Sequence, residues 1–294
     1  MDNGNEMRDF LVSRRARITP EQAGLPAYGG NRRVAGLRRE EVALLAGVSI
    51  DYYTRLERGR AHGASESVLK GVARALHLDE AERAHLFDLA RATAAPTAQQ
   101  APRRPVPQQV RPSVRRILDS MTAPAYLRNA RLDILAANQL GAALCAPVLN
   151  SPARPANNAR FLFLDPAAPE FYPDWERQAQ EVVAILRTEA GRSPADKALS
   201  NLIGELSTHS EDFSTWWAAH NVRFHRTGVK RFRHPVVGEL TLTYEALDLA
   251  ADTGLRLSAY TAEPGTPSDD ALKVLASWAA TLDQGVPAPV SDGG

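Results

Sequence analysis

A proline- and glutamine-rich stretch divides the chain into two parts. Residues 92–113 read ATAAPTAQQAPRRPVPQQVRPS and contain five prolines and four glutamines, with almost no large apolar side chain. Because proline fixes φ and restricts the residue before it, this stretch is incompatible with a continuous helix or a paired strand. The sequence therefore predicts an extended linker over 93–113. We expect folded domains over 1–92 and 114–282 and a flexible tail over 283–294.

The two parts differ in net charge. The 294-residue chain has a formal net charge of +1, but residues 1–116 carry 20 Lys/Arg against 13 Asp/Glu, and residues 117–294 carry 15 against 21. The resulting +7 and −6 are typical of a nucleic-acid-binding half joined to a half that does not bind nucleic acid. Only four of the 35 basic residues are lysine, a bias that suggests a GC-rich bacterial genome.

The composition indicates a cytoplasmic globular protein. Hydrophobic residues make up 44% and charged residues 23% of the sequence. No apolar run approaches the roughly 18 residues of a membrane span, and the N-terminus lacks the apolar core of a signal peptide. A single cysteine, Cys145, excludes an intrachain disulfide and fits a reducing compartment. We expect a cytoplasmic location and no membrane partner.

The first part has the apolar periodicity of a helical bundle. Spacings of i, i+3 and i+4 predict helices over 5–18, 37–46, 49–58 and 65–76, and a fifth that starts at Asp79. A loop with several glycines and prolines separates the first two helices. Five helices in about ninety residues predict a compact all-α domain.

Two of these helices are joined by a sharp turn. In REEVALLAGVSIDYYTRLERG (39–59), Gly47 is expected just past the first helix, where φ must turn positive. Ser49 suits the N-cap of the second helix, and Tyr53 and Leu56 supply its inward face. The pattern predicts a helix-turn-helix whose second helix projects its first turns away from the bundle.

An exposed helix start fits the major groove of B-DNA. Arg55 can donate to guanine O6 and N7, Asp51 can accept from cytosine N4 or orient Arg55, and Ile50 can contact a thymine methyl group. The predicted base contacts are Ser49, Ile50, Asp51, Thr54 and Arg55. The predicted phosphate contacts, which position the domain without reading sequence, are Arg32, Arg33, Arg38, Arg39, Tyr52, Arg58 and Arg60.

The stretch LRREEVALLAGVSIDYYTRLERGR resembles the Cro/phage-repressor (XRE) type of helix-turn-helix, including the terminal Leu-Glu-x-Gly. The resemblance implies a regulator that binds a double-stranded DNA operator. Relatives commonly have glutamine where this chain has Arg38 and Arg39, so an amide contact to phosphate becomes ionic here. Since one such module has a limited contact area, we expect a homodimer on paired half-sites.

The second part has the pattern of an antiparallel sheet with helices. ELTLTYEAL (239–247) and GLRLSAYTA (254–262) alternate with period two and predict strands with one buried face. Residues 131–145 predict a strand followed by a helix after Asn138, and further helices are predicted over 172–191, 194–206 and 212–220. The fold class is therefore multidomain: an all-α helix-turn-helix bundle followed by an α+β domain with an antiparallel sheet.

The basic segment FHRTGVKRFRHP (224–235) predicts a strand, a Thr-Gly turn and a second strand. Two interpretations of this hairpin are open. It is either an ordinary solvated hairpin, or His225 or one of its arginines pairs with a ligand carboxylate inside an apolar pocket.

Five landmarks appear in the order RFLFLDP, FYPDWE, LIGELSTHSEDFSTWWAAHNV, RTGVKRFRHPVVGELTLTYEAL and AYTAEPG. Together they resemble the MmyB-like ligand-binding domain of actinobacterial regulators over residues 112–280. This resemblance implies a PAS-like fold that holds a small apolar ligand, with a fatty acid as the implied class. Ala137 departs from it, because relatives often have tryptophan there. The predicted pocket residues are Trp175, Trp217, His220, His225, Leu240, Leu242, Tyr244 and Leu257.

No catalytic or cofactor motif accompanies these features. The sequence has no Gly-rich phosphate loop, Ser nucleophile elbow or HExxH motif, and the histidine spacings match no metal-ligand pattern. Cys145 is either a small buried group or a redox switch. We interpret the chain as a ligand-sensing transcriptional regulator that is not an enzyme and needs no cofactor or metal. The alternatives are a helical adaptor that binds protein, an enzyme fused to a DNA-binding domain, and a regulator whose second domain only dimerises.

Overall fold

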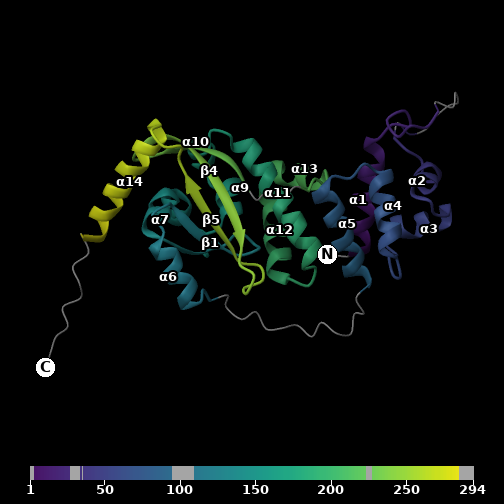
Figure 1. Cartoon of the computed structure of the whole chain (residues 1–294), viewed down its shortest axis with the longest axis horizontal. Helices are drawn as coiled ribbons and strands as arrows, with labels where there is room; N and C mark the ends of the chain where they lie inside the picture. The colour runs from purple at the N-terminus through teal and green to yellow at the C-terminus, as the bar shows by residue number, and fades with distance from the viewer. Residues whose placement is uncertain (1–2, 27–33, 35, 95–108, 223–226, 285–294) are drawn as a thin grey trace. The chain divides into compact units, whose positions relative to one another are not determined.

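The computed structural model of the chain describes residues 3–26, 34, 36–94, 109–222 and 227–284 (Figure 1). The chain forms two compact units, each made of two separate stretches of sequence. Unit 1 comprises Met1–Arg104 and Glu181–Phe224, and unit 2 comprises Pro105–Gln180 and His225–Gly294. None of the described helices is long and apolar enough to cross a lipid bilayer.

The five helices predicted for the first part are all found in the described region of unit 1. They are α1 (Asn3–Arg17), α2 (Arg39–Ala46), α3 (Ile50–Glu57), α4 (Glu66–Ala75) and α5 (Glu80–Ala94). Their apolar positions form one core, in which Phe10, Val42, Tyr53, Val72 and Leu86 are completely buried. The i, i+3, i+4 spacing read from the sequence therefore marks the faces that pack together.

Three further helices belong wholly or in part to unit 1 although they follow the linker in sequence. They are α11 (Trp175–Arg192, with unit 1 starting at Glu181), α12 (Lys197–His209) and α13 (Glu211–Ala218). Asp196 caps α12 and Ser210 caps α13, each accepting hydrogen bonds from backbone N–H groups of the first turn. Val222, just after α13, is part of the same apolar cluster as Phe10 and Leu86.

In the described part of unit 2, five strands form one antiparallel sheet in the order β2-β1-β5-β4-β3. The strands are β1 (Ala125–Arg128), β2 (Ile134–Ala137), β3 (Thr227–His234), β4 (Gly238–Asp248) and β5 (Arg256–Thr261). The sheet confirms the strands predicted from period-two alternation. Together with the helical bundle, it confirms the predicted multidomain fold class.

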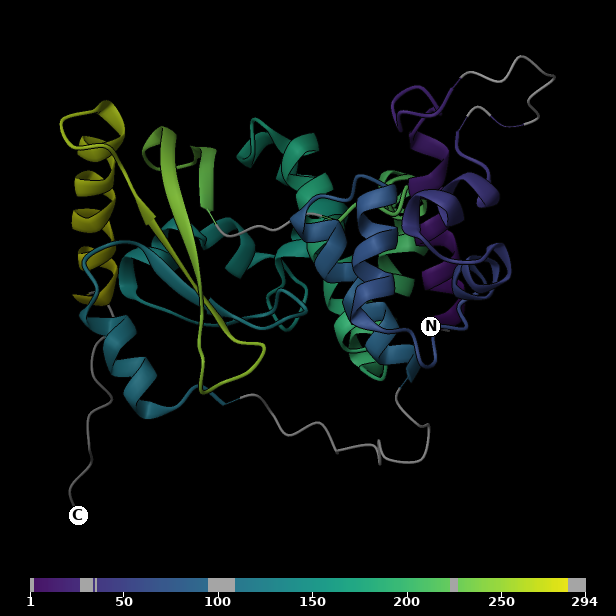
Figure 2. The same cartoon turned by 45° about the vertical axis from the view of Figure 1, so that its right-hand side comes forward.

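Six helices accompany this sheet in the described residues, in addition to the start of α11. They are α6 (Pro112–Ser120), α7 (Gln139–Leu144), α8 (Ala146–Asn150), α9 (Asn158–Leu164), α10 (Ala168–Phe171) and α14 (Pro267–Gln284). Asn138 directly follows β2 and caps α7, and its Oδ1 accepts from the N–H groups of Gly141 and Ala125. The C-terminal helix α14 packs beside α7 and β4 (Figure 2).

Both ends of the predicted linker are helical. Helix α5 continues to Ala94, and α6 begins at Pro112, where the missing proline N–H is tolerated in the first turn. The predicted boundaries at 93 and 113 thus fall inside helices. The predicted tail over 283–294 likewise starts inside a helix, because α14 continues to Gln284. Residues 95–108 and 285–294 lie outside the described part of the chain.

The predicted Thr-Gly turn within residues 224–235 is wrong. Thr227 and Gly228 lie in β3, which pairs with β4 without interruption from Thr227↔Glu245 to His234↔Gly238. The turn comes later, where Pro235 offers no N–H and Gly238 has a φ of +74°. Gly228 has another role: a Cβ at this position would lie 3.0 Å from the Tyr244 ring.

Candidate functional site

The turn between α2 and α3 has the predicted chemistry. Gly47 adopts a left-handed conformation with φ 70° and ψ 34°, which an L side chain rarely adopts. The N–H of Val48 then donates back to the carbonyl of Ala43 at 3.0 Å. Ser49 is the N-cap of α3, and its Oγ accepts from the N–H of Tyr52 at 3.2 Å. Local sequence therefore determines both the end of α2 and the start of α3.

Helix α3 has one buried face and one exposed face. Tyr53, Leu56 and Glu57 are buried against the bundle. On the other face, the predicted base contacts Ser49, Ile50, Asp51 and Arg55 are exposed, and Thr54 is half-buried. The Arg55 guanidinium lies 5.2 Å from the centroid of the Tyr52 ring. The structure thus brings the five residues predicted to contact bases together on one outward surface.

Most of the predicted phosphate contacts lie just before or just after the predicted base contacts in the sequence. Arg38, Arg39, Arg58 and Arg60 are exposed, and Tyr52 is half-buried. The backbone N–H of Arg38 donates to the Glu41 carboxylate at 2.6 Å, which caps α2. The Arg38 side chain is 43% exposed. Arg32 and Arg33 lie outside the described residues.

Glu57 is a structural residue of this site that the sequence reasoning did not identify. Its carboxylate is only 1% exposed and accepts from Arg15 Nε at 2.9 Å and from Arg39 Nε at 2.7 Å. Arg15 also donates to the carbonyl of Leu37 at 2.8 Å. Two arginines from α1 and α2 therefore hold the end of α3. Burial and the nearby carboxylate raise the pKa of Tyr53 far above its ordinary value.

The only sequence signal for this cluster is the glutamate of LERG, since both arginines are distant in the chain. The glycine of the same motif is a second anchor. Gly59 has a φ of +78°, and a Cβ there would lie 2.2 Å from the carbonyl oxygen of Gly4. The end of α3 therefore lies directly against the start of α1.

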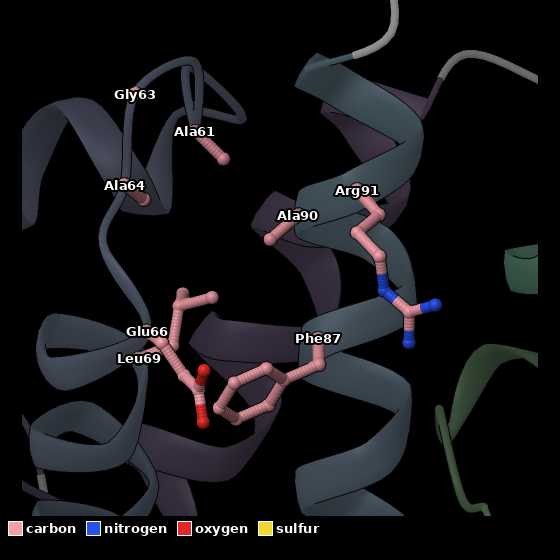
Figure 3. A pocket seen from close by; sticks show the side chains of 8 residues that line it. All are labelled: Ala61, Gly63, Ala64, Glu66, Leu69, Phe87, Ala90 and Arg91. Atoms are coloured by element: carbon pink, nitrogen blue, oxygen red, sulfur yellow. The ribbon is translucent and has the colours of Figure 1, made fainter.

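A pocket of about 400 Å³ lies between the start of α4 and helix α5 (Figure 3). Its lining is mostly small or apolar, with one carboxylate and one guanidinium group. The lining residues are Ala61, Gly63, Ala64, Glu66, Leu69, Phe87, Ala90 and Arg91. None of the predicted DNA-binding or ligand-binding residues is among them.

In unit 2, one face of the sheet forms an aromatic interior. Phe171 and Tyr172 each lie 5.6 Å from Phe232 of β3, and Phe232 lies 5.7 Å from Tyr260 of β5, measured between ring centroids. Strand register places Tyr244 beside Tyr260 on the same face. Phe161 lies 6.0 Å from Tyr172 and extends the cluster. Such a surface suits an apolar ligand or a dry core.

Several polar atoms are buried within this aromatic interior. The hydroxyls of Tyr126 and Tyr260 lie 3.1 Å apart, and Asn158 Nδ2 donates to Tyr126 at 3.3 Å. Lys230 is 9% exposed, and its Nζ lies 5.1 Å from the Tyr244 ring centroid. Within the described residues, the Asn158 Oδ1 atom has no hydrogen-bond partner.

Burial keeps the phenols and the thiol of this interior neutral. It raises the pKa of Tyr126, Tyr172 and Tyr260 above the ordinary range of phenols. It also raises the pKa of the Cys145 thiol to about 12. Because a reactive cysteine needs a thiolate, this environment favours the interpretation of Cys145 as a small buried group.

The predicted pocket residues are spread over different parts of the structure. Leu240, Leu242 and Tyr244 share the aromatic face. Leu257 pairs with Leu127 and Leu247, which places it on the opposite face, in an apolar cluster with Leu118. Both faces of β5 are buried because it is a central strand, so alternation alone does not identify the inner face.

The other predicted pocket residues do not lie on this sheet. Trp175 is half-buried at the start of α11 and donates from Nε1 to the carbonyl of Leu162 at 2.7 Å. Trp217 and His220 belong to unit 1, and His225 lies outside the described residues. The sequence reasoning did not identify Tyr126, Tyr260, Lys230 and Asn158. For Tyr260 and Lys230 the available signal was strand register: Tyr260 pairs with Tyr244, and Lys230 pairs with Leu242.

Comparison with known proteins agrees with this architecture. Residues 14–86 match the model of a helix-turn-helix domain family. Residues 110–275, more than half of the chain, match the MmyB-like transcription regulator ligand binding domain. No functionally curated protein matches the chain. With a helix-turn-helix domain followed by this second domain, the chain belongs to the MmyB-like family of DNA-binding transcription regulators with a ligand-binding domain.

Proposed function

We propose that the chain recognises a specific DNA operator by placing α3 in the major groove. The observation that carries this proposal is the division of α3 into a buried face with Tyr53 and Leu56 and an exposed face with Ile50, Asp51 and Arg55. The first turns of an exposed helix fit the groove, and their side chains then meet the base edges.

Each side chain on this face has a role that follows from its chemistry. Arg55 binds guanine O6 and N7, Asp51 accepts from cytosine N4 or orients Arg55, and Ile50 contacts a thymine methyl group. Ser49 and Thr54 lie beside these groups and complete the predicted base contacts. The proposed phosphate contacts are Arg32, Arg33, Arg38, Arg39, Tyr52, Arg58 and Arg60.

The assembly that follows is a cytoplasmic homodimer. A single α3 covers only a few base pairs, so two copies on half-sites one helical turn apart supply the contact area of a specific complex. Analytical ultracentrifugation with and without operator DNA measures this stoichiometry. A monomer that binds its operator in a 1:1 complex would contradict the dimer.

The operator itself is found by selecting bound sequences from a random DNA library. The test then compares Arg55→Ala with Arg74→Ala, which removes an exposed arginine from α4. We expect Arg55→Ala to weaken operator binding by about 1–3 kcal/mol and to relax preference at one base pair. Arg74→Ala should bind like the unaltered protein. Equal affinities of the two variants would contradict the role of α3.

We also propose that the aromatic interior of unit 2 binds a small apolar ligand with a polar head group, of the fatty-acid class. Phe171, Tyr172 and Phe232 supply the apolar surface. The Lys230 ammonium group is buried, and so is the Oδ1 of Asn158, for which the described part of the chain supplies no hydrogen-bond partner. Buried polar groups of this kind orient a head group.

Decanoate and 1-decanol are suitable probes, because they share a chain and differ in head group. We expect decanoate to bind better, and Lys230→Met to weaken decanoate binding at least about tenfold by calorimetry, since a charge-assisted bond is lost. Lys273→Met is the matched control, because Lys273 is 65% exposed on α14. Binding of neither probe, with no small molecule in denatured extracts of the protein, would favour a domain that only dimerises.

A further inference from the structure

Arg187 of α11 is completely buried in unit 1 and is surrounded by groups from two other elements. Its Nη1 donates to the carboxylate of Glu6 on α1 and lies 2.9 Å from His220 Nδ1. Its Nη2 donates to the carbonyl of Trp217 on α13. The guanidinium carbon lies 4.0 Å from the centroid of the Trp217 ring. One side chain therefore joins α1, α11 and α13.

Other side chains of α1 and α5 reach the same group of helices. Arg14, only 2% exposed, donates to the carbonyl of His220 and pairs with Glu82 of α5 at 3.0 Å. Arg17 donates to Asn221 Oδ1. These bonds connect the helix-turn-helix bundle to residues 181–222, a segment that we call the brace.

Apolar and steric contacts fit the same arrangement. His85 of α5 is completely buried, and a Cβ at Gly191 of α11 would lie 2.7 Å from its ring. The ring of His85 packs edge-on against Phe10 at 5.0 Å. Val222 joins the apolar core of the bundle. The brace is thus packed as a part of the bundle.

The pKa of Glu6 shows how strongly this buried carboxylate depends on Arg187 and His220. Burial alone would raise the pKa of this carboxyl, but the hydrogen bond from His220 and the charge of Arg187 lower it to about 2. A buried charge that loses its partner strongly destabilises the folded state, because nothing in the protein then compensates for the hydration that the charge lost on burial. Removal of Arg187 should therefore disturb α1 directly.

Helix α1 also contacts α3, the helix that we propose enters the major groove. Glu6 and Arg14 face the brace, whereas Arg15 binds the buried carboxylate of Glu57 at the end of α3. Gly4 contacts Gly59 just beyond α3. A continuous set of packed groups therefore runs from Arg187 through α1 to α3.

We propose that the brace, which the MmyB-like domain match includes, is an integral part of the DNA-binding unit, and that Arg187 is a positioning residue for α3. Operator affinity then depends on a side chain that contacts no DNA and lies far from α3 in sequence. This inference rests on the proposed contact of α3 with DNA. Residues of the matched domain (110–275) can then influence the orientation of α3 through direct contacts with α1.

The test uses the full-length protein with Arg187→Met and the matched control Arg177→Met. Both substitutions remove one positive charge from α11, but Arg177 is 50% exposed and belongs to unit 2. We expect Arg187→Met to weaken operator binding about tenfold and to speed amide hydrogen exchange in α1 and α3. Arg177→Met should leave both measurements unchanged.

A double variant separates the ionic pair from a general loss of structure. Glu6→Gln/Arg187→Met lacks both charges, so its operator affinity and exchange rates should lie closer to those of the unaltered protein than those of Arg187→Met alone. If Arg187→Met does not fold, the double variant and Arg187→Lys, which keeps the charge without the planar fork, take its place. Unaltered affinity and unaltered exchange in α1 and α3 for these variants would overturn the proposal.

Failure of the proposed function gives a different result. If the unaltered protein binds no DNA, no variant gives a signal in the operator assay, and the proposed role of α3 is wrong. Hydrogen exchange alone then tests the role of the brace. Faster exchange in α3 for Arg187→Met, but not for Arg177→Met, supports the brace, and equal rates in both variants overturn it.

Discussion

Arg39 of α2 and Glu57 of α3 form an ion pair across the helix-turn-helix, with Arg39 Nε 2.7 Å from Glu57 Oε1. The carboxylate is buried, while the Arg39 side chain is 47% exposed. The angle between the two short helices is therefore held by a charged contact as well as by apolar packing. It also gives Arg39, a proposed phosphate contact, a structural role.

Loss of the Glu57 charge should destabilise unit 1. Glu57→Gln leaves Arg15, whose side chain is 14% exposed, facing a neutral amide, so we expect the free energy of unfolding to fall by about 1.5–3 kcal/mol. Denaturant unfolding monitored by circular dichroism measures the change. Glu40→Gln is the control, because Glu40 is 60% exposed beside Arg38. Similar stabilities of the two variants would show that the buried pair contributes little.

Two glycines with the same backbone conformation should respond differently to alanine. Gly59 and Gly63 have φ values of +78° and +77°. Among the described residues other than Gly63 and its two chain neighbours, no heavy atom lies within 4 Å of a Cβ placed at Gly63, whereas a Cβ at Gly59 would overlap the backbone of Gly4. Gly63→Ala should destabilise by about 1–2 kcal/mol from backbone strain alone.

Gly59→Ala carries the same strain and adds overpacking, so we expect a further loss of about 1–3 kcal/mol. The difference between the melting temperatures of the two variants isolates the contact between α1 and the end of α3. Equal melting temperatures would mean that this contact is not close in solution.

Arg38 offers a clean test of electrostatic contact with the DNA backbone, because its guanidinium pairs with the exposed Glu40 and not with buried Glu57. Arg38→Ala should weaken binding to all sequences to a similar degree. It should also reduce the slope of log affinity against log salt concentration by about one. Fluorescence anisotropy at several salt concentrations measures both. Arg83→Ala, on the exposed face of α5, should leave the slope unchanged.

The stability of unit 1 should depend on pH through His85. Burial lowers the pKa of His85 from 6.5 to about 3. Below pH 6.5 the unfolded chain binds a proton that the folded chain excludes, so the free energy of unfolding falls as the pH falls towards 3. The expected slope is about 1.4 kcal/mol per pH unit.

Glu6 adds a second loss only at lower pH, because its pKa is 4.5 in the unfolded chain and about 2 when folded. Between pH 6.5 and 4.5 the contribution of His85 is therefore separate from that of Glu6, and His234 of unit 2, whose pKa is also lowered by burial, is the same in every variant compared. His85→Leu should flatten the slope in this range, and His62→Leu, which alters an exposed histidine, should not. An unchanged slope in His85→Leu would contradict the buried neutral imidazole.

The features that sequence predicted best are those with short-range causes. Gly47 and Ser49 were predicted from what a helix end and a helix start require, and the structure has both. The alternation in β4 predicts a strand with one buried face, and this prediction does not depend on which strands are its neighbours. Gly228 shows the limit of such reasoning: Thr-Gly is typical of a turn, but here the glycine makes room for the Tyr244 ring across the sheet.

Only some residues of the candidate site could be predicted from such short-range rules. The exposed face of α3 follows from one helix and its periodicity. The face of Leu257 does not, because a central strand is buried on both sides and only register decides which residues share a surface. Glu57 was not identified because its partners, Arg15 and Arg39, come from other helices.

The amino-acid sequence by itself determined the two kinds of domain, the position of the sharp turn and the strands of the sheet. Each depends on steric and periodic rules that act over a few residues. Only the tertiary structure decided that residues 181–222 pack with the N-terminal bundle, and that Arg187 meets Glu6 there. The physical reason is that a buried charge is stable only beside its partner, and the partner is brought near by folding of the whole unit.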